Sequence, residues 1–247
     1  MDYWLHYNSD ILITRVNKAL DSDWHKIYYI YIYHMIIIPI GLQCTSASFK
    51  NDFNKSKTLP FDWMFATPSF VYEMLVLLLE KNIDIDDLVR NHFLYCEKRA
   101  NYRGYEHYYT CNNGFAMYNT KYNVIFPHDN YTTENINKYI RRFERLKDII
   151  LNSSEELYFL YTSQSSLESG NFTIDGNIVV KDVYVHISKI YKLIGKFRSN
   201  FKVLLFDAIK EEQIELLDPN VIFHTLTKSD YRGELLSEMN NFKHLFE

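Results

Sequence analysis

Short apolar runs alternate with amphipathic helical segments along this chain, and that alternation limits the folds open to it. Four runs are apolar enough to form buried strands: residues 36–40, 157–161, 202–208 and 221–226. The first ends an apolar stretch, residues 27–40, that suits a central strand covered on both sides, or two strands in sequence. Residues 51–58 form a polar connector, and we expect a loop in residues 163–176. Apolar residues recur every three or four positions, as on one face of an α-helix, in residues 68–81, 135–151 and 180–197. In the second of these helices, Thr132 is the candidate cap and Tyr139 belongs to the apolar face. Strands that alternate with helices are typical of a largely parallel sheet. We therefore predict an α/β fold with a single, mostly parallel, Rossmann-like sheet flanked by helices.

The length and composition are compatible with one large domain. The chain has 247 residues, and 47% of them are apolar, which is the range of globular proteins and argues against global disorder. No internal repeat or low-complexity linker marks a boundary, so we expect one domain over residues 1–247. Within it, Ser9 or Asp10 caps a short helix in residues 1–26, which we interpret as an N-terminal helical extension.

Charge and cysteine content exclude several classes of function. The net charge of −4 argues against a general nucleic-acid-binding protein, which usually carries a basic excess. The cysteines at positions 44, 96 and 111 are odd in number and lack paired spacing, so we expect a reducing compartment rather than a disulfide framework. No CxxC or HExxH motif occurs, and we expect neither a metal nor a cofactor.

The apolar N-terminal third does not have the pattern of a membrane segment. Residues 27–40 are apolar, but they contain His34, end at a proline step and are shorter than the roughly 20 residues that a spanning helix needs. The N-terminus carries Asp2 where a signal peptide carries basic residues. We expect a soluble, unprocessed protein without membrane contact. The abundance of Asn, Ile, Lys and Tyr indicates an A/T-rich coding sequence, as in a virus or a low-GC microbe, so the expected location is the cytoplasm, or the host cytoplasm or virus particle.

The first apolar run leads into a cysteine. It stops at Gly41, and Cys44 follows three residues later, before small and polar residues suited to a helix start. The free backbone N–H groups of a helix start stabilise negative charge, which lowers the pKa of a cysteine and makes it more nucleophilic. The alternative is a small apolar residue packed behind the strand, because free cysteine is among the most buried residue types. The local sequence leaves both open.

Several short motifs in residues 36–165, about half of the chain, resemble one family. They are Ile40-Gly41-x-x-Cys44-x-x-Ala47, Pro60-Phe61-Asp62-Trp63, the strand-like 123–126 before Pro127-His128-Asp129, and the arginine-bearing helix around 141–145. This pattern resembles a family of uncharacterised proteins, described as papain-like cysteine peptidases, that occurs in large DNA viruses and bacteria. This chain departs from the family at Pro39 and Ile40, where Ser and Leu are more usual.

The resemblance and the order of the residues lead to a Cys-His hydrolase hypothesis. Cys44 is the nucleophile, His128 the general base, and Asp129 the group that orients the histidine, with a protein or peptide as substrate. A thiol has a pKa of about 8.5, so an imidazole that removes its proton provides a usable thiolate at pH 7. Neighbours in an extended segment point to opposite faces, so Asp129 can orient His128 only if the chain turns there, which Pro127 favours.

Other residues are weaker candidates for the same site. Asp62 is a second candidate for the orienting group, although an aspartate between two aromatic residues also suits a structural turn. Its neighbour Trp63 is a further candidate member of the site. Gln43 could donate to an oxyanion, or be a polar loop residue. Arg141, with its arginine neighbours, could clamp a phosphate or carboxylate, or belong to a solvated helix face.

A second hypothesis comes from another class of protein. The segments after residue 130 predict parallel strands, whereas a papain-like enzyme usually places antiparallel, barrel-like strands after its histidine. The alternative is therefore a non-catalytic or sugar/nucleotide-binding α/β module, such as a virion or assembly component, in which Cys44 only packs. No GxGxxG or P-loop motif supports a dinucleotide or NTP site. Nothing in the sequence indicates an oligomeric state.

Overall fold

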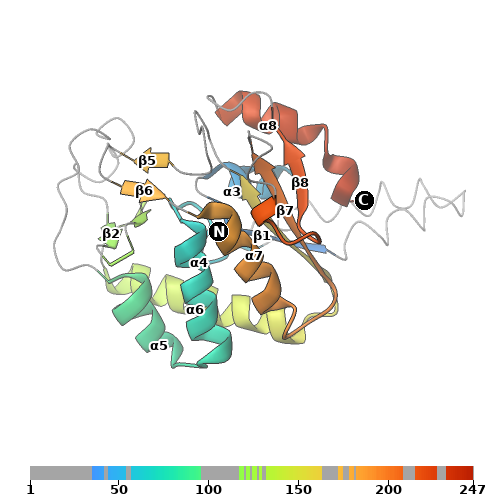
Figure 1. Ribbon diagram of the computed structural model, residues 1–247. Helices are drawn as coiled ribbons and strands as arrows, with labels where there is room; N and C mark the ends of the chain where they lie inside the picture. The colour runs from blue at the N-terminus through green and yellow to red at the C-terminus, as the bar shows by residue number, and fades with distance from the viewer. Residues whose placement is uncertain are drawn as a thin grey trace, which may run out of the picture.

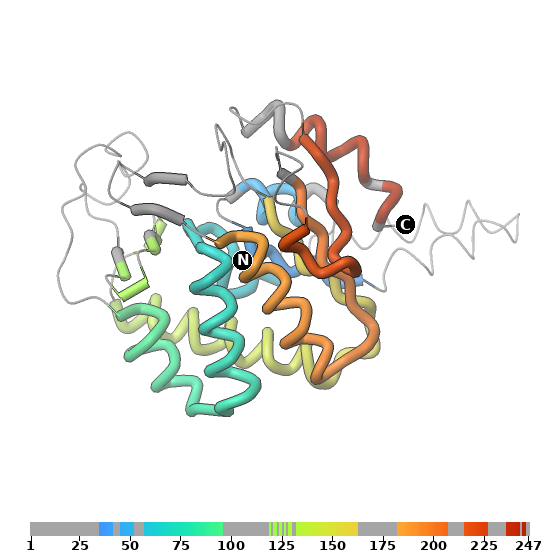
Figure 2. The backbone as a smooth tube through the Cα atoms, viewed as in Figure 1, coloured from blue at the N-terminus to red at the C-terminus, as the bar shows by residue number. Residues whose placement is uncertain are grey.

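The computed structural model describes residues 35–41, 44–53, 57–95, 117–119, 121–122, 124–126, 128–129, 132–162, 172–174, 178–180, 182–207, 215–226 and 232–246. Figure 2 follows this path from β1 in blue to the C-terminal segment in red. The predicted N-terminal extension, residues 1–26, lies outside the described residues, as do Gln43, Cys96 and Cys111.

Four parallel strands form the main sheet. They are β1 (Met35–Pro39), β4 (Glu156–Thr162), β7 (Phe201–Asp207) and β8 (Ile222–Thr225), in the order β1-β4-β7-β8. The register pairs Ile36 with Leu157, Phe159 with Val203, and Leu204 with Ile222. This all-parallel sheet, flanked by helices (Figure 1), confirms the predicted α/β fold. Two antiparallel hairpins lie apart from it: β2 (Met117–Asn119) with β3 (Val124–Phe126), and β5 (Phe172–Ile174) with β6 (Ile178–Val180).

Six α-helices lie in the described part of the chain. The α-helices are α3 (Cys44–Phe53), α4 (Pro68–Leu75), α5 (Ile85–Asp87), α6 (Thr133–Asn152), α7 (Val183–Ile194) and α8 (Arg232–Asn240). Two of them continue as π-helical turns, α4 into η1 (Val76–Glu80) and α5 into η2 (Leu88–Phe93), and a 3-10 turn, η5 (Lys243–Phe246), ends the described chain. The Thr132 side chain accepts from Asn135 N–H at 3.2 Å and starts α6, which confirms the predicted cap.

Helices cover both faces of the sheet. On one face, Ile38, Phe159 and Leu205 belong to a large core shared with α4, α6 and α7. On the other, Ile37 and Leu160 belong to a smaller core, completed by Phe49 of α3 and Met239 of α8. Successive strand residues point to opposite faces, so a sheet covered on both sides needs continuous apolar runs, as the sequence has.

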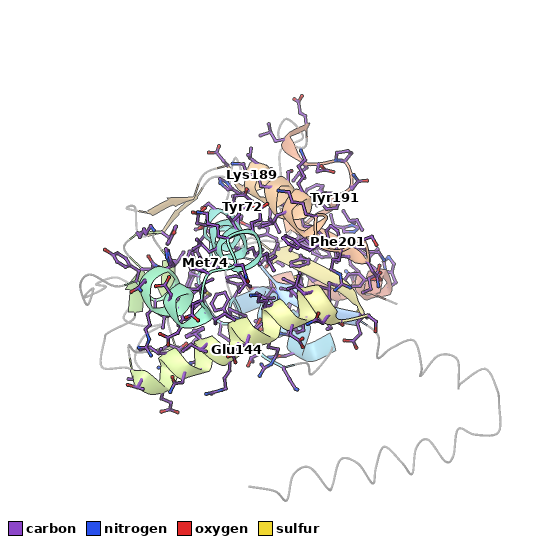
Figure 3. The ribbon with its side chains drawn as sticks, turned by 90° about the horizontal axis from the view of Figure 1, so that it is seen from below. Tyr72, Met74, Glu144, Lys189, Tyr191 and Phe201 are labelled. Atoms are coloured by element: carbon purple, nitrogen blue, oxygen red, sulfur yellow. The ribbon has the colours of Figure 1, made fainter. Side chains whose placement is uncertain are left out.

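The helices on the larger core also contact one another. Tyr72 of α4 lies beside Lys189 of α7, whose Nζ is 5.8 Å from the ring centroid (Figure 3). Two residues further along α7, the ring of Tyr191 lies 5.2 Å from the ring of Phe201, which joins the helix to the start of β7.

The structure differs from the sequence-based expectation in five places. The predicted helix 180–197 begins only at Val183, because residues 178–180 pair as β6, and the predicted loop 163–176 contains β5. Helix α3 extends to Phe53, into the predicted connector. Strand β1, expected in the centre of the sheet, stands at one end of the described strand order, although both of its faces are covered. Helix α8 was not predicted. Within the described ranges, no helix has the length and apolarity required to cross a bilayer.

Candidate functional site

The turn after β1 has the predicted strand-to-helix form. Ile40 N–H donates to Leu160 O at 2.9 Å, which extends the pairing with β4 by one residue, and the chain then bends at Gly41. Cys44 is the first residue of α3, so its backbone stands at a helix start, as the sequence predicts. The side chain of Cys44 and the whole of Gln43 lie outside the described part of the structure.

Gly41 is required by a close approach between this turn and the end of β4. A Cβ at position 41 would lie 2.5 Å from Ser46 Oγ and 2.7 Å from the backbone nitrogen of Thr162, which no side chain can accommodate without movement. Ser46 Oγ donates to Thr162 Oγ1 at 3.3 Å, and both residues are buried. The hydroxyl of Thr45 is also buried and has no hydrogen-bond partner among the described residues. The hydroxyls of Ser46 and Thr162 therefore meet at the carboxyl edge of the sheet, and Thr45 directly precedes Ser46 in α3.

A buried ion pair connects α3 to the loop of residues 57–63. Lys50 Nζ lies 2.9 Å from Asp62 Oδ2, which also accepts from the backbone N–H of Leu59 at 3.0 Å. Lys50 Nζ additionally donates to the backbone oxygen of Lys57 at 3.0 Å. Burial lowers the pKa of Lys50, while the carboxylate of Asp62 opposes that shift. In the described structure, Asp62 therefore holds a turn and pairs with a cation.

Trp63 and His128 are brought together from distant parts of the sequence. The half-buried Trp63 has a φ of 63°, in the left-handed region that residues other than glycine rarely adopt. Its ring meets the ring of His128 edge-on, with centroids 6.4 Å apart and planes at 81°. His128 lies in the turn after β3 and is exposed. Because Trp63 follows Asp62, a series of contacts runs from α3 through the Lys50–Asp62 pair to His128.

Asp129 is buried and bonds to α6. One carboxylate oxygen accepts from Lys138 Nζ and the other from Tyr139 OH. Burial, followed by the charge of Asp129, raises the pKa of Tyr139 well above its usual value, so this hydroxyl stays protonated and donates. These bonds fix the turn that carries His128 against α6. The orientation of His128 by Asp129 remains a prediction.

The arginines of α6 have separate surroundings. Arg141 is exposed, while the guanidinium of Arg142 lies 5.2 Å from the ring centroid of Tyr139. Arg145 Nη1 donates to the backbone oxygen of Thr58 at 2.6 Å and so holds the 57–63 loop from the α6 side.

Sequence reasoning missed Lys50 and Tyr139 as parts of this site. The aromatic neighbours of Asp62 indicated a buried carboxylate in need of a cation, but they did not distinguish Lys50 from Lys55 or Lys57. Tyr139 was assigned to the apolar face of its helix, which is correct, yet its hydroxyl reaches Asp129 from there.

Two further results bear on the chemistry of the chain. Among the described residues, no three side chains of His, Cys, Asp or Glu are grouped closely enough to hold a metal ion. In comparisons with protein families, curated proteins and solved structures, nothing matches the chain.

Proposed function

We propose that the protein is a cysteine-dependent hydrolase of the peptidase type, in which Cys44 is the nucleophile and His128 the general base. The observation that supports this is the series of contacts from α3, which begins at Cys44, through Lys50–Asp62 and Trp63 to His128. This arrangement links the helix of the proposed nucleophile to the turn of the proposed base.

The start of α3 favours a thiolate. The helix is 10 residues long and has no acidic residue in its first turn, so no nearby carboxylate on the helix opposes the negative charge. Its unpaired backbone N–H groups stabilise an anion at this end. In the proposal, the pKa of Cys44 therefore lies below the roughly 8.5 of a free thiol.

The proposed reaction follows the general course of Cys-His hydrolysis. His128 takes the thiol proton, and Cys44 Sγ adds to the carbonyl carbon of an amide in a protein or peptide substrate. The C–N bond breaks, the departing amine takes the proton from His128, and a thioester remains. Water, deprotonated by His128, then attacks the thioester, releasing the acid and restoring the thiol. Asp129 acts as a positioning residue, because its bonds to Lys138 and Tyr139 hold the turn that carries His128.

Selective alkylation tests this proposal without a known substrate. At pH 7, iodoacetamide is expected to modify Cys44 faster than Cys96 or Cys111, as followed by mass spectrometry of digested peptides. His128→Asn should slow the modification of Cys44, whereas His244→Asn, which removes an exposed histidine of η5, should not. Labelling of Cys44 at or below the rate of the other two cysteines would contradict the proposal.

A specific observation favours a second candidate, a sugar- or nucleotide-binding α/β module. The hydroxyls of Ser46 and Thr162 lie at the carboxyl edge of a parallel sheet, which is where open α/β sheets bind ligands. In this alternative Cys44 only packs, so Cys44→Ala would leave ligand binding intact. For either candidate we propose a reducing compartment, the cytoplasm or a virus particle in an infected host. The reason is that neither the number nor the spacing of the three cysteines suggests disulfide bonds.

A further inference from the structure

One face of α6 carries four cations in a row. Lys138, Arg141, Arg142 and Arg145 occupy positions i, i+3, i+4 and i+7 of the helix, which places them on a common face. We call these four residues the basic stripe. Glu134 and Asp148 lie one turn beyond its two ends.

Most of the stripe lacks a carboxylate partner. Lys138 pairs with Asp129, but within the described part of the chain no carboxylate oxygen lies within 4.0 Å of the guanidinium nitrogens of Arg141, Arg142 or Arg145. Glu144, labelled on the same helix in Figure 3, is exposed and forms no such pair with them. Arg145 donates to a neutral carbonyl and Arg142 lies over a tyrosine ring, so their charges are oriented but not neutralised.

The buried ammonium of Lys50 adds to the positive charge around the stripe. Arg142 and Arg145 lie near enough to the buried ammonium of Lys50 for their charges to lower its pKa, in addition to the larger effect of burial. Asp62 is the carboxylate that pairs with Lys50. The protein as a whole is acidic, with a net charge of −4, so the local positive charge is not a consequence of general composition.

The stripe borders the proposed active site at both ends. At one end, Lys138 bonds Asp129, the residue after His128. At the other, Arg145 bonds Thr58, in the loop that carries Trp63. A ligand that lies along the stripe therefore extends from the turn that carries His128 to the loop that carries Trp63. These two segments also meet at the Trp63–His128 contact.

We propose that the basic stripe binds an acidic segment of the peptide substrate, with Asp or Glu side chains contacting Arg141, Arg142 and Arg145. This inference rests on the proposed function and adds the substrate class to it. From Lys138 to Arg145 the helix rises by seven residue steps, roughly 10 Å, which is the length of about three extended residues. Guanidinium groups bind carboxylates through paired hydrogen bonds. A short acidic peptide fits this length better than a long polyanion, which the net charge of the protein repels.

Binding to an inactivated protein tests the stripe apart from catalysis. The probe is a fluorescein-labelled peptide with three consecutive glutamates, and the protein is the full chain carrying Cys44→Ala. Fluorescence anisotropy should show binding that weakens as salt is added. Arg141→Gln with Arg142→Gln should weaken binding about tenfold, on the basis of roughly 0.7 kcal/mol for each charge. Lys189→Gln with Lys192→Gln removes the same charge from exposed positions of α7 and should change little.

The outcomes separate this inference from the proposed function. A peptide with three glutamines in place of the glutamates should not bind. Equal binding of both peptides, equal effects of the two double variants, or tighter binding of a single-stranded oligonucleotide would overturn the inference. If Cys44 proves selectively reactive while the acidic peptide fails to bind, only the stripe is refuted. If the peptide binds as expected while Cys44 is unreactive, the stripe is retained as an acidic-peptide site and hydrolysis is refuted.

Discussion

Lys50 and Asp62 form an ion pair at 2.9 Å in which neither side chain is more than 1% exposed. Asp62 follows Lys50 by twelve residues in the sequence, and the pair joins α3 to the loop that carries Trp63. Each of these two buried charges is stabilised by the other, because either one alone would be a buried charge without a counter-ion.

Removal of one member of this pair should be strongly destabilising. Lys50→Met leaves the Asp62 carboxylate buried without its cation, and we expect the free energy of unfolding to fall by about 3–5 kcal/mol. The double variant Lys50→Met, Asp62→Leu removes both charges and should cost much less than the sum of the single variants. Urea unfolding followed by circular dichroism measures all three.

An exposed pair on the same protein provides the control for this cycle. Arg90 and Asp86 form an i,i+4 ion pair with side chains 41% and 51% exposed. Arg90→Met should lower the free energy of unfolding by only about 0.5 kcal/mol, because water solvates the remaining carboxylate. Similar losses for Arg90→Met and Lys50→Met would mean that the Lys50–Asp62 pair is not buried as described.

Gly41→Ala should destabilise the fold through the contact between the β1–α3 turn and β4. The new methyl group would meet a backbone nitrogen at 2.7 Å, and a backbone cannot move aside as a side chain does. We expect a loss of about 1–3 kcal/mol in the free energy of unfolding. Gly195→Ala is the matched control, because its Cβ has no neighbour closer than 3.4 Å; it should be neutral or slightly stabilising.

The stability of the protein should decrease below neutral pH, partly through His224. Its ring stacks on Phe206, with centroids 5.2 Å apart, and makes a tilted contact with Phe242 at 4.6 Å. Its buried Nε2 has no hydrogen-bond partner among the described residues. Burial, with a smaller contribution from the charge of His244, lowers the pKa of His224 in the folded protein. The unfolded chain, with a histidine pKa of about 6.5, then binds protons more readily than the folded one.

The lowered pKa of His224 in the folded protein determines the direction of the pH dependence. The melting temperature should fall as the pH drops through about 6.5 and level off below the lowered pKa of the folded state. His224→Phe, which keeps the stacking but cannot be protonated, should reduce the slope. Some slope should remain, because burial also lowers the pKa of His92. An unchanged slope in His224→Phe would exclude His224 as a source.

Arg198 should be difficult to replace, even by lysine. Its Nη1 donates to the oxygen of Ile149 at 3.1 Å, its Nη2 to that of Glu155 at 2.5 Å, and its Nε to that of Asn200 at 3.1 Å. One planar group thus connects the end of α6, the start of β4 and the start of β7. Arg198→Lys keeps the charge but not the fork of donors, so we expect a loss of about 1–3 kcal/mol on urea unfolding. Arg141→Lys, at an exposed position, should change the stability by less than about 0.5 kcal/mol.

The main elements were predictable because their signals are local. The run of residues 36–40 forms β1, Thr132 caps α6, and Cys44 starts a helix, each as its immediate neighbours indicate. In contrast, β6 has three residues, too few for a period to appear, and its pairing with β5 decides its structure. Helix α8 has nine residues, and its apolar residues, Leu235, Leu236 and Met239, are too few for their spacing to identify a helix.

The contacts between the candidate residues could not be predicted from the sequence. Trp63 and His128 were both candidates, and the structure places their rings in contact, which no spacing in the sequence indicates. The partners of Asp62 and Asp129 could not be assigned, because several lysines were available to each. Which cation reaches a buried carboxylate depends on how α3 and α6 pack, and packing is a property of the whole fold.

The pairing of β1 with β4 has a consequence for how the chain folds. Met35 and Glu156 are partners although about 120 residues separate them, so this contact closes a very long loop. Such a topology folds slowly, because the entropy of closure must be overcome before the strand gains its hydrogen bonds. At a synthesis rate of about 5–20 residues per second, roughly 6–24 s pass between the synthesis of the apolar β1 segment and that of β4. In that interval the β1 segment is exposed to aggregation, and folding yield should depend on chaperones more than native stability does.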